Sequence, residues 1–132
     1  MTDQAAARQW DSAVAFGLIR IGAGVALLRK RDFAIRSCGG SPSDPLLKGL
    51  FTFWGLRDIG LGITAFAATR PGGNVPKQVA QHGVADTVDT AIIVGLIANQ
   101  RLPRGRGSGA AALAAGTALG EFATAWRLRR LL

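Results

Sequence analysis

Residues 54–62 read WGLRDIGLG, which places an arginine and an aspartate side by side within an otherwise apolar run. The run extends from Gly49 to Ala68, and Arg57 and Asp58 are its only charged residues. A helix of about 20 apolar residues is long enough to cross the roughly 30 Å hydrocarbon core of a bilayer. Any fold predicted for this chain must therefore account for two full charges at the middle of a segment that has the length of a membrane span.

Three further apolar runs have a comparable length and carry few charges. They cover residues 12–28 with Arg20, residues 79–98 with His82, Asp86 and Asp89, and residues 109–126 with Glu121. Segments rich in Gly, Pro and basic residues separate the runs, as is typical of turns between helices. We therefore predict an all-α chain of one domain, a four-helix transmembrane bundle with up-down topology and helices at about residues 9–29, 45–69, 76–99 and 108–128.

Residues typical of helix starts stand where the runs begin. Asp44 is a predicted N-cap, and Pro45 follows it at the first helical position. Pro76 opens the third predicted helix, and Ser108 is a plausible cap of the fourth. These signals agree with the boundaries of the apolar runs.

Glycine predicts close packing of the helices. Gly116 and Gly120 form a GxxxG pair in the fourth predicted helix. The first two helices offer similar smooth surfaces at Gly22, Gly24, Gly60 and Gly62. Small residues let backbones approach closely in lipid, where the hydrophobic effect cannot hold helices together. A soluble four-helix bundle is the alternative, but the first, second and fourth runs lack the wide polar face that soluble helices show.

The charge balance is strongly basic, with 16 Lys and Arg against 8 Asp and Glu and a formal net charge of +8. Most cations stand in short clusters between the apolar runs, as in membrane proteins, whereas a nucleic-acid-binding protein gathers them on one folded face. We therefore predict a bilayer environment and no nucleic-acid partner. The single Cys38 excludes an intramolecular disulfide, and the sequence contains no cofactor-binding or metal-binding motif.

Five charged residues lie near the middle of their runs, and so at a similar depth in a bilayer: Arg20, Arg57, Asp58, Asp86 and Asp89. An unpaired charge at that depth costs about 2.5–3.5 kcal/mol on insertion scales. The five side chains are therefore predicted to face the interior and to pair with one another. Such pairs can serve a chemical function, or they can simply hold the register of the helices.

The third predicted helix has one polar face. Gln78, His82, Asp86 and Asp89 follow spacings of four, four and three, which place them on one side of an α-helix. That side is predicted to face inward. Lipid contacts nearer the other end are assigned to four aliphatic residues, Ile92, Ile93, Leu96 and Ile97.

His82 and Glu121 are predicted to lie at one mouth of the cluster. His82 is near the start of the third helix and Glu121 near the end of the fourth, and in an up-down bundle these ends share a side of the membrane. A hydrogen-bonded imidazole is favoured over a catalytic one at His82. Metal binding by one histidine and two carboxylates of a single helix is conceivable but is not a specific pattern.

The predicted cluster has more negative than positive groups. Arg20 and Arg57 face four carboxylates, those of Asp58, Asp86, Asp89 and Glu121. A site of low dielectric does not hold an uncompensated anion, so at least one carboxyl is expected to be protonated or to bind a cation. Arg57 is predicted to be the main counter-charge of Asp86 and Asp89, because its planar guanidinium can bridge two carboxylates.

Three segments together resemble a known group of proteins: GLIRIGAGVALL (residues 17–28), GLRDIGLGI (55–63) and GVADTVDTAII (83–93). They are similar to small four-helix integral membrane families of unknown function, and in layout to the wider DoxX-like group. The resemblance implies that Arg57, Asp58 and Asp89 (or Asp86) form the polar centre, and it implies no settled activity. The basic segment after the first run is longer than the pattern of these families.

Two classes of function fit the sequence. The first is a structural or accessory membrane protein, either a homo-oligomer or a partner subunit that packs through the fourth helix. The second is a small membrane enzyme or proton-coupled carrier that uses the charged cluster. The first is favoured slightly, because no catalytic geometry can be inferred from the sequence. A polar cavity around Arg57, Asp86 and Asp89 would favour the second class, and a dry, fully paired network would exclude it.

The basic residues also predict an orientation in a cell membrane that the chain crosses several times. The segments after the first and third runs hold eight Lys and Arg outside the runs, against six in the termini and the remaining loop. The positive-inside rule places the two richer loops in the cytoplasm and both termini outside. Trp10 and Trp126 are expected to anchor the terminal side at the membrane interface.

Overall fold

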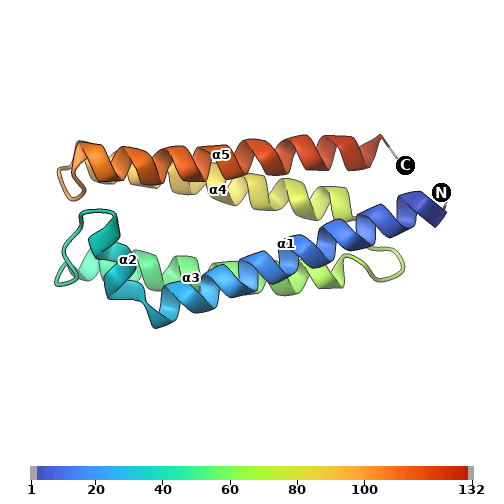
Figure 1. The fold of residues 1–132 in the computed structure, drawn as a ribbon, viewed down its shortest axis with the longest axis horizontal. Coiled ribbons are helices and arrows are strands. Elements are labelled where there is room, and N and C mark those ends of the chain that lie inside the picture. The colour runs from blue at the N-terminus through green and yellow to red at the C-terminus, as the bar shows by residue number, and fades with distance from the viewer. Residues whose placement is uncertain (1–2, 131–132) are drawn as a thin grey trace.

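A computed structural model describes residues 3–130, and within that range the chain forms helices and no strand (Figure 1). The helices are α1 (Asp3–Arg29), α2 (Arg31–Ser37), α3 (Pro45–Ala67), α4 (Val75–Ala98) and α5 (Arg104–Arg129). The prediction of an all-α chain is therefore confirmed. The short helix α2 was not predicted, and it occupies the basic segment that follows the first apolar run.

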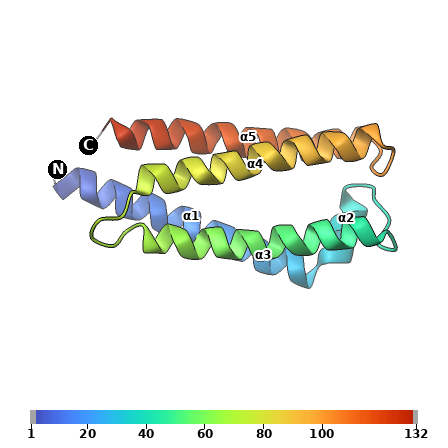
Figure 2. The same ribbon diagram turned by 180° about the vertical axis from the view of Figure 1, so that it is seen from behind.

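The four long helices form two pairs, and Figure 1 shows that they run along one common axis, antiparallel within each pair. The α1 helix packs along α3, and α4 packs along α5. Seen from behind, α3 and α4 lie next to each other, and α1 also contacts α4 (Figure 2). The start of α1 and the end of α5 lie at the same end of the molecule, and α2 lies at the opposite end (Figure 1).

Side-chain caps begin two of the long helices. The Asp44 carboxylate accepts a hydrogen bond from the Leu46 amide at 2.9 Å, and Asn74 caps α4 by accepting from the Lys77 amide at 2.9 Å. Arg101 donates a hydrogen bond of 2.7 Å to Asp44, and this bond lowers the pKa of that carboxyl. The fourth predicted helix begins earlier than expected, at Arg104, so its expected cap residue lies inside α5.

Two apolar clusters form the core, one towards each end of the helices. The first gathers Ile35, Leu47, Phe51, Trp54, Ile93, Leu96, Leu102 and Ala111, and the second gathers Ala13, Val75, Val79, Ala125 and Leu128. Ile93 and Leu96 are buried in the first cluster, so their predicted lipid contact is wrong. The outer face of α4 carries valines instead, at Val84, Val88 and Val94.

The outer surface of the long helices is rich in large apolar side chains. Leu18 and Ile19 of α1, Leu56 of α3, and Leu113 and Leu119 of α5 are each more than half exposed. A helix in a soluble protein normally turns such residues towards the core and its charges towards water. Here the middle of the long helices shows the reverse distribution.

Among the described helices, only α1 contains a stretch, Trp10–Arg29, that is long and apolar enough to cross a membrane by length and composition. Four such helices were predicted. The other long helices fall short because they carry charges near their middle, and α5 is also rich in Ala, Gly and Thr. Length and composition by themselves are therefore weak evidence for a membrane protein.

Close approach of α1 and α3 depends on two pairs of glycines. A Cβ at Gly62 would lie 2.6 Å from the Gly17 carbonyl oxygen, and Gly24 and Gly55 meet in the same way further along. These contacts leave no room for a methyl group.

The glycines of the predicted GxxxG pair do not pack within the chain. A Cβ at Gly116 or Gly120 would have no neighbour within 4 Å, and the same holds for Gly22 and Gly60. Only Gly24 and Gly62 of the predicted smooth surfaces lie at a helix crossing.

We predict that Gly62→Ala lowers the free energy of unfolding by about 1–3 kcal/mol, because the added methyl overpacks the α1–α3 contact. Gly60→Ala on the same helix should leave stability unchanged or raise it by up to about 1 kcal/mol, through helix propensity alone. Thermal unfolding followed by circular dichroism compares the two. Equal effects would contradict the close contact.

Candidate functional site

Six polar or charged side chains are buried near the middle of the long helices: Arg20, Asp58, His82, Asp86, Asp89 and Glu121. They come from α1, α3, α4 and α5, so every long helix contributes at least one. Arg57 of α3 lies beside them with a partly buried side chain. Buried charges are stable only when they are paired and hydrogen-bonded, so the partners of each group determine what the site can do.

Arg20 is the centre of the network. Its guanidinium lies 3.2 Å from the Asp58 carboxylate, 2.8 Å from the Asp86 carboxylate and 2.7 Å from the Glu121 carboxylate. These partners belong to α3, α4 and α5, so one side chain of α1 joins all four long helices. The planar guanidinium suits this role because it presents several donors in a fixed geometry.

Arg57 forms the second half of the network. Its two terminal nitrogens donate to the two oxygens of Asp89, at 2.6 and 2.8 Å, and one of them also donates to Asp58 at 2.8 Å. The Asp58 carboxylate therefore bridges Arg57 and Arg20. The prediction that Arg57 binds both aspartates of α4 is wrong for Asp86, whose counter-charge is Arg20. A residue's depth in a helix does not indicate the rotation of that helix, which decides this pairing.

Thr117 of α5 is a site residue that the sequence reasoning missed. Its hydroxyl donates a hydrogen bond of 2.6 Å to Asp86, and it also lies 2.8 Å from the Ala114 carbonyl oxygen. The only signal in the sequence is the position of Thr117, one helical turn before Glu121 in an Ala- and Gly-rich helix.

His82 is fully buried but lies beside the network rather than in it. Its Nε2 atom is 3.2 Å from the Leu61 carbonyl oxygen and 3.4 Å from the Gln78 amide nitrogen. Its ring and that of Phe16 form a T-shaped pair, with centroids 6.3 Å apart. Glu121 instead pairs with Arg20, so His82 and Glu121, which were predicted at one mouth, have different polar partners.

Several buried polar atoms in the network or on neighbouring side chains have no hydrogen-bond partner among the described residues. They include one carboxylate oxygen of Glu121 (Oε2), the Nε atom of Arg57 and the indole nitrogen of Trp54. The charge count is uneven as well, because two guanidinium groups face four carboxylates. Formally, two negative charges have no counter-charge in the protein.

A groove of about 620 Å³ lies beside the network, and α1 and α5 form its walls. Both arginines and all four carboxylates line it, together with apolar side chains of both helices. It exists because α1 and α5 do not pack closely along their lengths, whereas each packs tightly against its own partner helix. Nothing in the sequence predicts this gap, because it depends on how the two helix pairs are set against each other.

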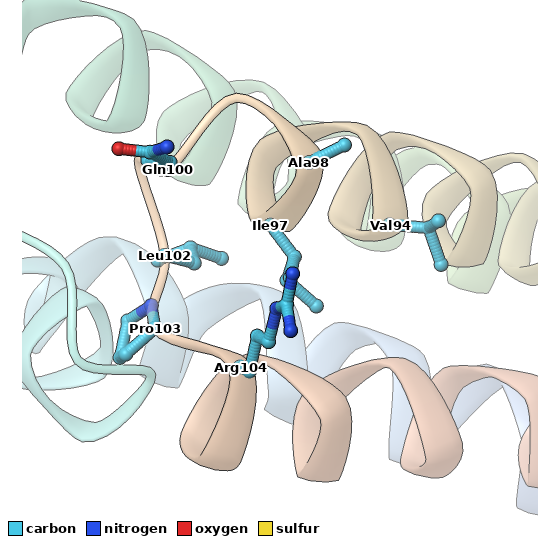
Figure 3. A pocket seen from close by; sticks show the side chains of 7 residues that line it. All are labelled: Val94, Ile97, Ala98, Gln100, Leu102, Pro103 and Arg104. Atoms are coloured by element: carbon cyan, nitrogen blue, oxygen red, sulfur yellow. The ribbon is translucent and has the colours of Figure 1, made fainter.

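A second cavity of about 540 Å³ lies at the turn between α4 and α5 (Figure 3). Its lining combines the apolar side chains of Val94, Ile97 and Leu102 with Gln100 and Arg104. None of the buried charges reaches it. The groove between α1 and α5 is therefore the better candidate for a functional site.

Comparisons with protein-family models, with curated proteins and with solved structures found no match for this chain. The resemblance to DoxX-like membrane families stays a prediction from the sequence. The function of this chain is therefore inferred from the geometry of the network and of the groove.

We predict that Arg20→Ala lowers stability more than Arg57→Ala. Losing Arg20 leaves Glu121 without a counter-charge and Asp86 with only a hydroxyl, and breaking a buried pair costs about 3–5 kcal/mol. Losing Arg57 strands Asp89, whereas Asp58 keeps its second arginine. Denaturant unfolding of the purified variants measures the difference.

A double variant serves as the control. Glu121→Ala combined with Arg20→Ala removes one stranded carboxylate and should recover part of the lost stability. If Arg57→Ala proves the more damaging change, the network is centred on Arg57 and not on Arg20.

Proposed function

We propose that this chain is a multi-pass membrane protein whose helices α1, α3, α4 and α5 form a four-helix transmembrane bundle, and that it binds a small molecule at the charged groove between α1 and α5. The distribution of apolar and charged side chains supports the transmembrane bundle. Large apolar side chains cover the outside of the helices while their mid-helix charges are buried. Charged residues inside membrane proteins face the interior in the same way and mark functional sites by default.

The ends of the helices support the same arrangement. Trp10 and Trp126 are both exposed, and they lie on the parts of α1 and α5 that share one end of the molecule (Figure 1). The Arg130 guanidinium lies 3.7 Å from the centre of the Trp126 ring. Aromatic and basic side chains of this kind favour the interface between lipid and water. The opposite end carries the two more basic loops, which the positive-inside rule places in the cytoplasm.

The proposal of binding rests on one observation. The ion network has polar atoms without partners and an excess of carboxylates, and it lines a groove large enough for a ligand. Ligand sites typically measure about 300–1,000 Å³ and combine apolar walls with a few polar groups. A network that served packing alone would be expected to satisfy its own polar atoms, because half-satisfied buried networks are costly. This favours a carrier or a small enzyme over a purely structural role.

A purely accessory role is the second candidate. Ala112, Gly116 and Gly120 form an exposed ridge on α5, with Leu113 and Leu119 beside it. Small residues on a lipid-facing helix allow another helix to pack closely. A second copy of the chain or a membrane partner could use this ridge without any ligand in the groove.

We predict that the protein stays in the membrane fraction after washing with alkaline carbonate and is released only by detergent. A reporter active only in the cytoplasm should give no signal when fused to the C-terminus. Release by carbonate would contradict the membrane assignment. A strong reporter signal would instead reverse the orientation and leave the bundle in place.

We also predict that water reaches the groove although the groove lies at the depth of the bilayer. In a Cys38→Ser background, Gly120→Cys should react faster with a polar, membrane-impermeant thiol reagent than Gly116→Cys, because Gly120 lines the groove and Gly116 does not. A thiol must be exposed to water to ionise, and the thiolate is the form that reacts readily with the reagent. Equal and slow labelling of both positions would indicate a dry site and favour the accessory role.

A further inference from the structure

We propose that the ligand is a cationic amphiphile, with an ammonium head group bound at Glu121 and a hydrocarbon chain along the apolar walls of the groove. This inference rests on the proposed function, because it names the class of molecule that the groove would bind. It follows from the charge of the site, from the free oxygen of Glu121 and from the shape of the groove.

The charge of the groove selects the head group. Both arginines pair with carboxylates through their terminal nitrogens, although the Nε atom of Arg57 has no partner among the described residues. Four carboxylates line a site that holds two positive charges. An anionic head group would add to the negative excess. A neutral hydroxyl could donate a hydrogen bond but would leave the excess unchanged. An ammonium group does both, since it donates hydrogen bonds to an ionised Glu121 and supplies the positive charge that a proton on this carboxyl would otherwise supply.

Glu121 offers the place for that head group. Its Oε1 atom accepts a hydrogen bond of 2.7 Å from Arg20, which fixes the orientation of the carboxylate, and its Oε2 atom has no partner among the described residues. Glu121 is only 5% exposed, and it lines the groove. A buried carboxylate oxygen without a donor is destabilising, so a ligand that supplies one gains binding energy there.

The walls suit a hydrocarbon chain. Phe16, Ile19 and Leu27 of α1 face Leu113 of α5 across the groove, and the aromatic ring of Trp54 also lines it. Ile19 and Leu113 are highly exposed at its rim. In the proposed membrane orientation this rim meets the acyl chains, so an amphiphile could enter sideways.

Trp54 provides a direct reporter of binding. The chain has three tryptophans, so Trp10→Phe combined with Trp126→Phe leaves Trp54 alone. This variant is placed in nanodiscs of zwitterionic lipid and titrated with dodecylammonium, dodecanol and dodecanoate, three probes with the same chain and different head groups. We expect a saturable change in Trp54 emission with dodecylammonium, a much weaker response with dodecanol, and none with dodecanoate beyond that of protein-free nanodiscs.

Two substitutions, each with its own control variant, locate the binding site. Glu121→Gln keeps the shape of the side chain and an acceptor for Arg20, and it should weaken dodecylammonium binding by about tenfold or more. Asp11→Asn, which removes an exposed carboxylate of α1 outside the groove, should leave binding unchanged. Gly120→Phe should block binding by filling the groove, and Gly116→Phe on the same exposed ridge is its matched control.

The outcomes separate this inference from the proposed function. If dodecanoate or dodecanol binds as tightly as dodecylammonium, the groove binds amphiphiles without selecting a cation, and only this inference fails. If no probe binds and Gly120→Cys is not labelled, the proposed function fails as well. If circular dichroism shows that Glu121→Gln does not fold, the comparison of Gly120→Phe with Gly116→Phe replaces it. Equal affinity of these two variants for dodecylammonium would overturn the inference.

Discussion

The ion pairs of Arg20 join the two halves of this molecule. The α1 and α3 helices form one tight pair and α4 and α5 the other, while α1 and α5 do not pack closely along their lengths. The Arg20 side chain spans this gap and contacts a carboxylate on each of the three other long helices. Because a buried charge without a partner is strongly unfavourable, this one side chain constrains how the two pairs can be set against each other.

Packing supports the network from both ends. An apolar cluster lies towards each end of the long helices, and the charges occupy the section between them. Glycines at the α1–α3 contact let those two backbones approach closely, so that Arg20 of α1 can reach Asp58 of α3. The same arrangement leaves apolar side chains on the outside, which is why we propose a lipid environment.

The groove follows from the same division into two pairs. Tight contact within each pair and a gap between α1 and α5 leave a space beside the ion network. The excess of carboxylates faces that space, and one oxygen of Glu121 has no donor among the described residues. The proposals on binding depend on this combination, since an apolar groove or a fully paired network alone would not indicate a ligand.

The sequence by itself determined that the chain is all-α, that Asp44 caps the second long helix, and that carboxylates outnumber arginines near the middle of the runs. These properties follow from local pattern and composition. Only the tertiary structure decided that Arg20 and not Arg57 pairs with Asp86, that Ile93 and Leu96 are buried, and that Gly116 and Gly120 stay free. Helical periodicity places residues on a common face, but the rotation of each helix and its choice of neighbour depend on contacts distant in sequence. For the same reason Thr117, the network's hydroxyl, and the groove between α1 and α5 could not be predicted from the chain alone.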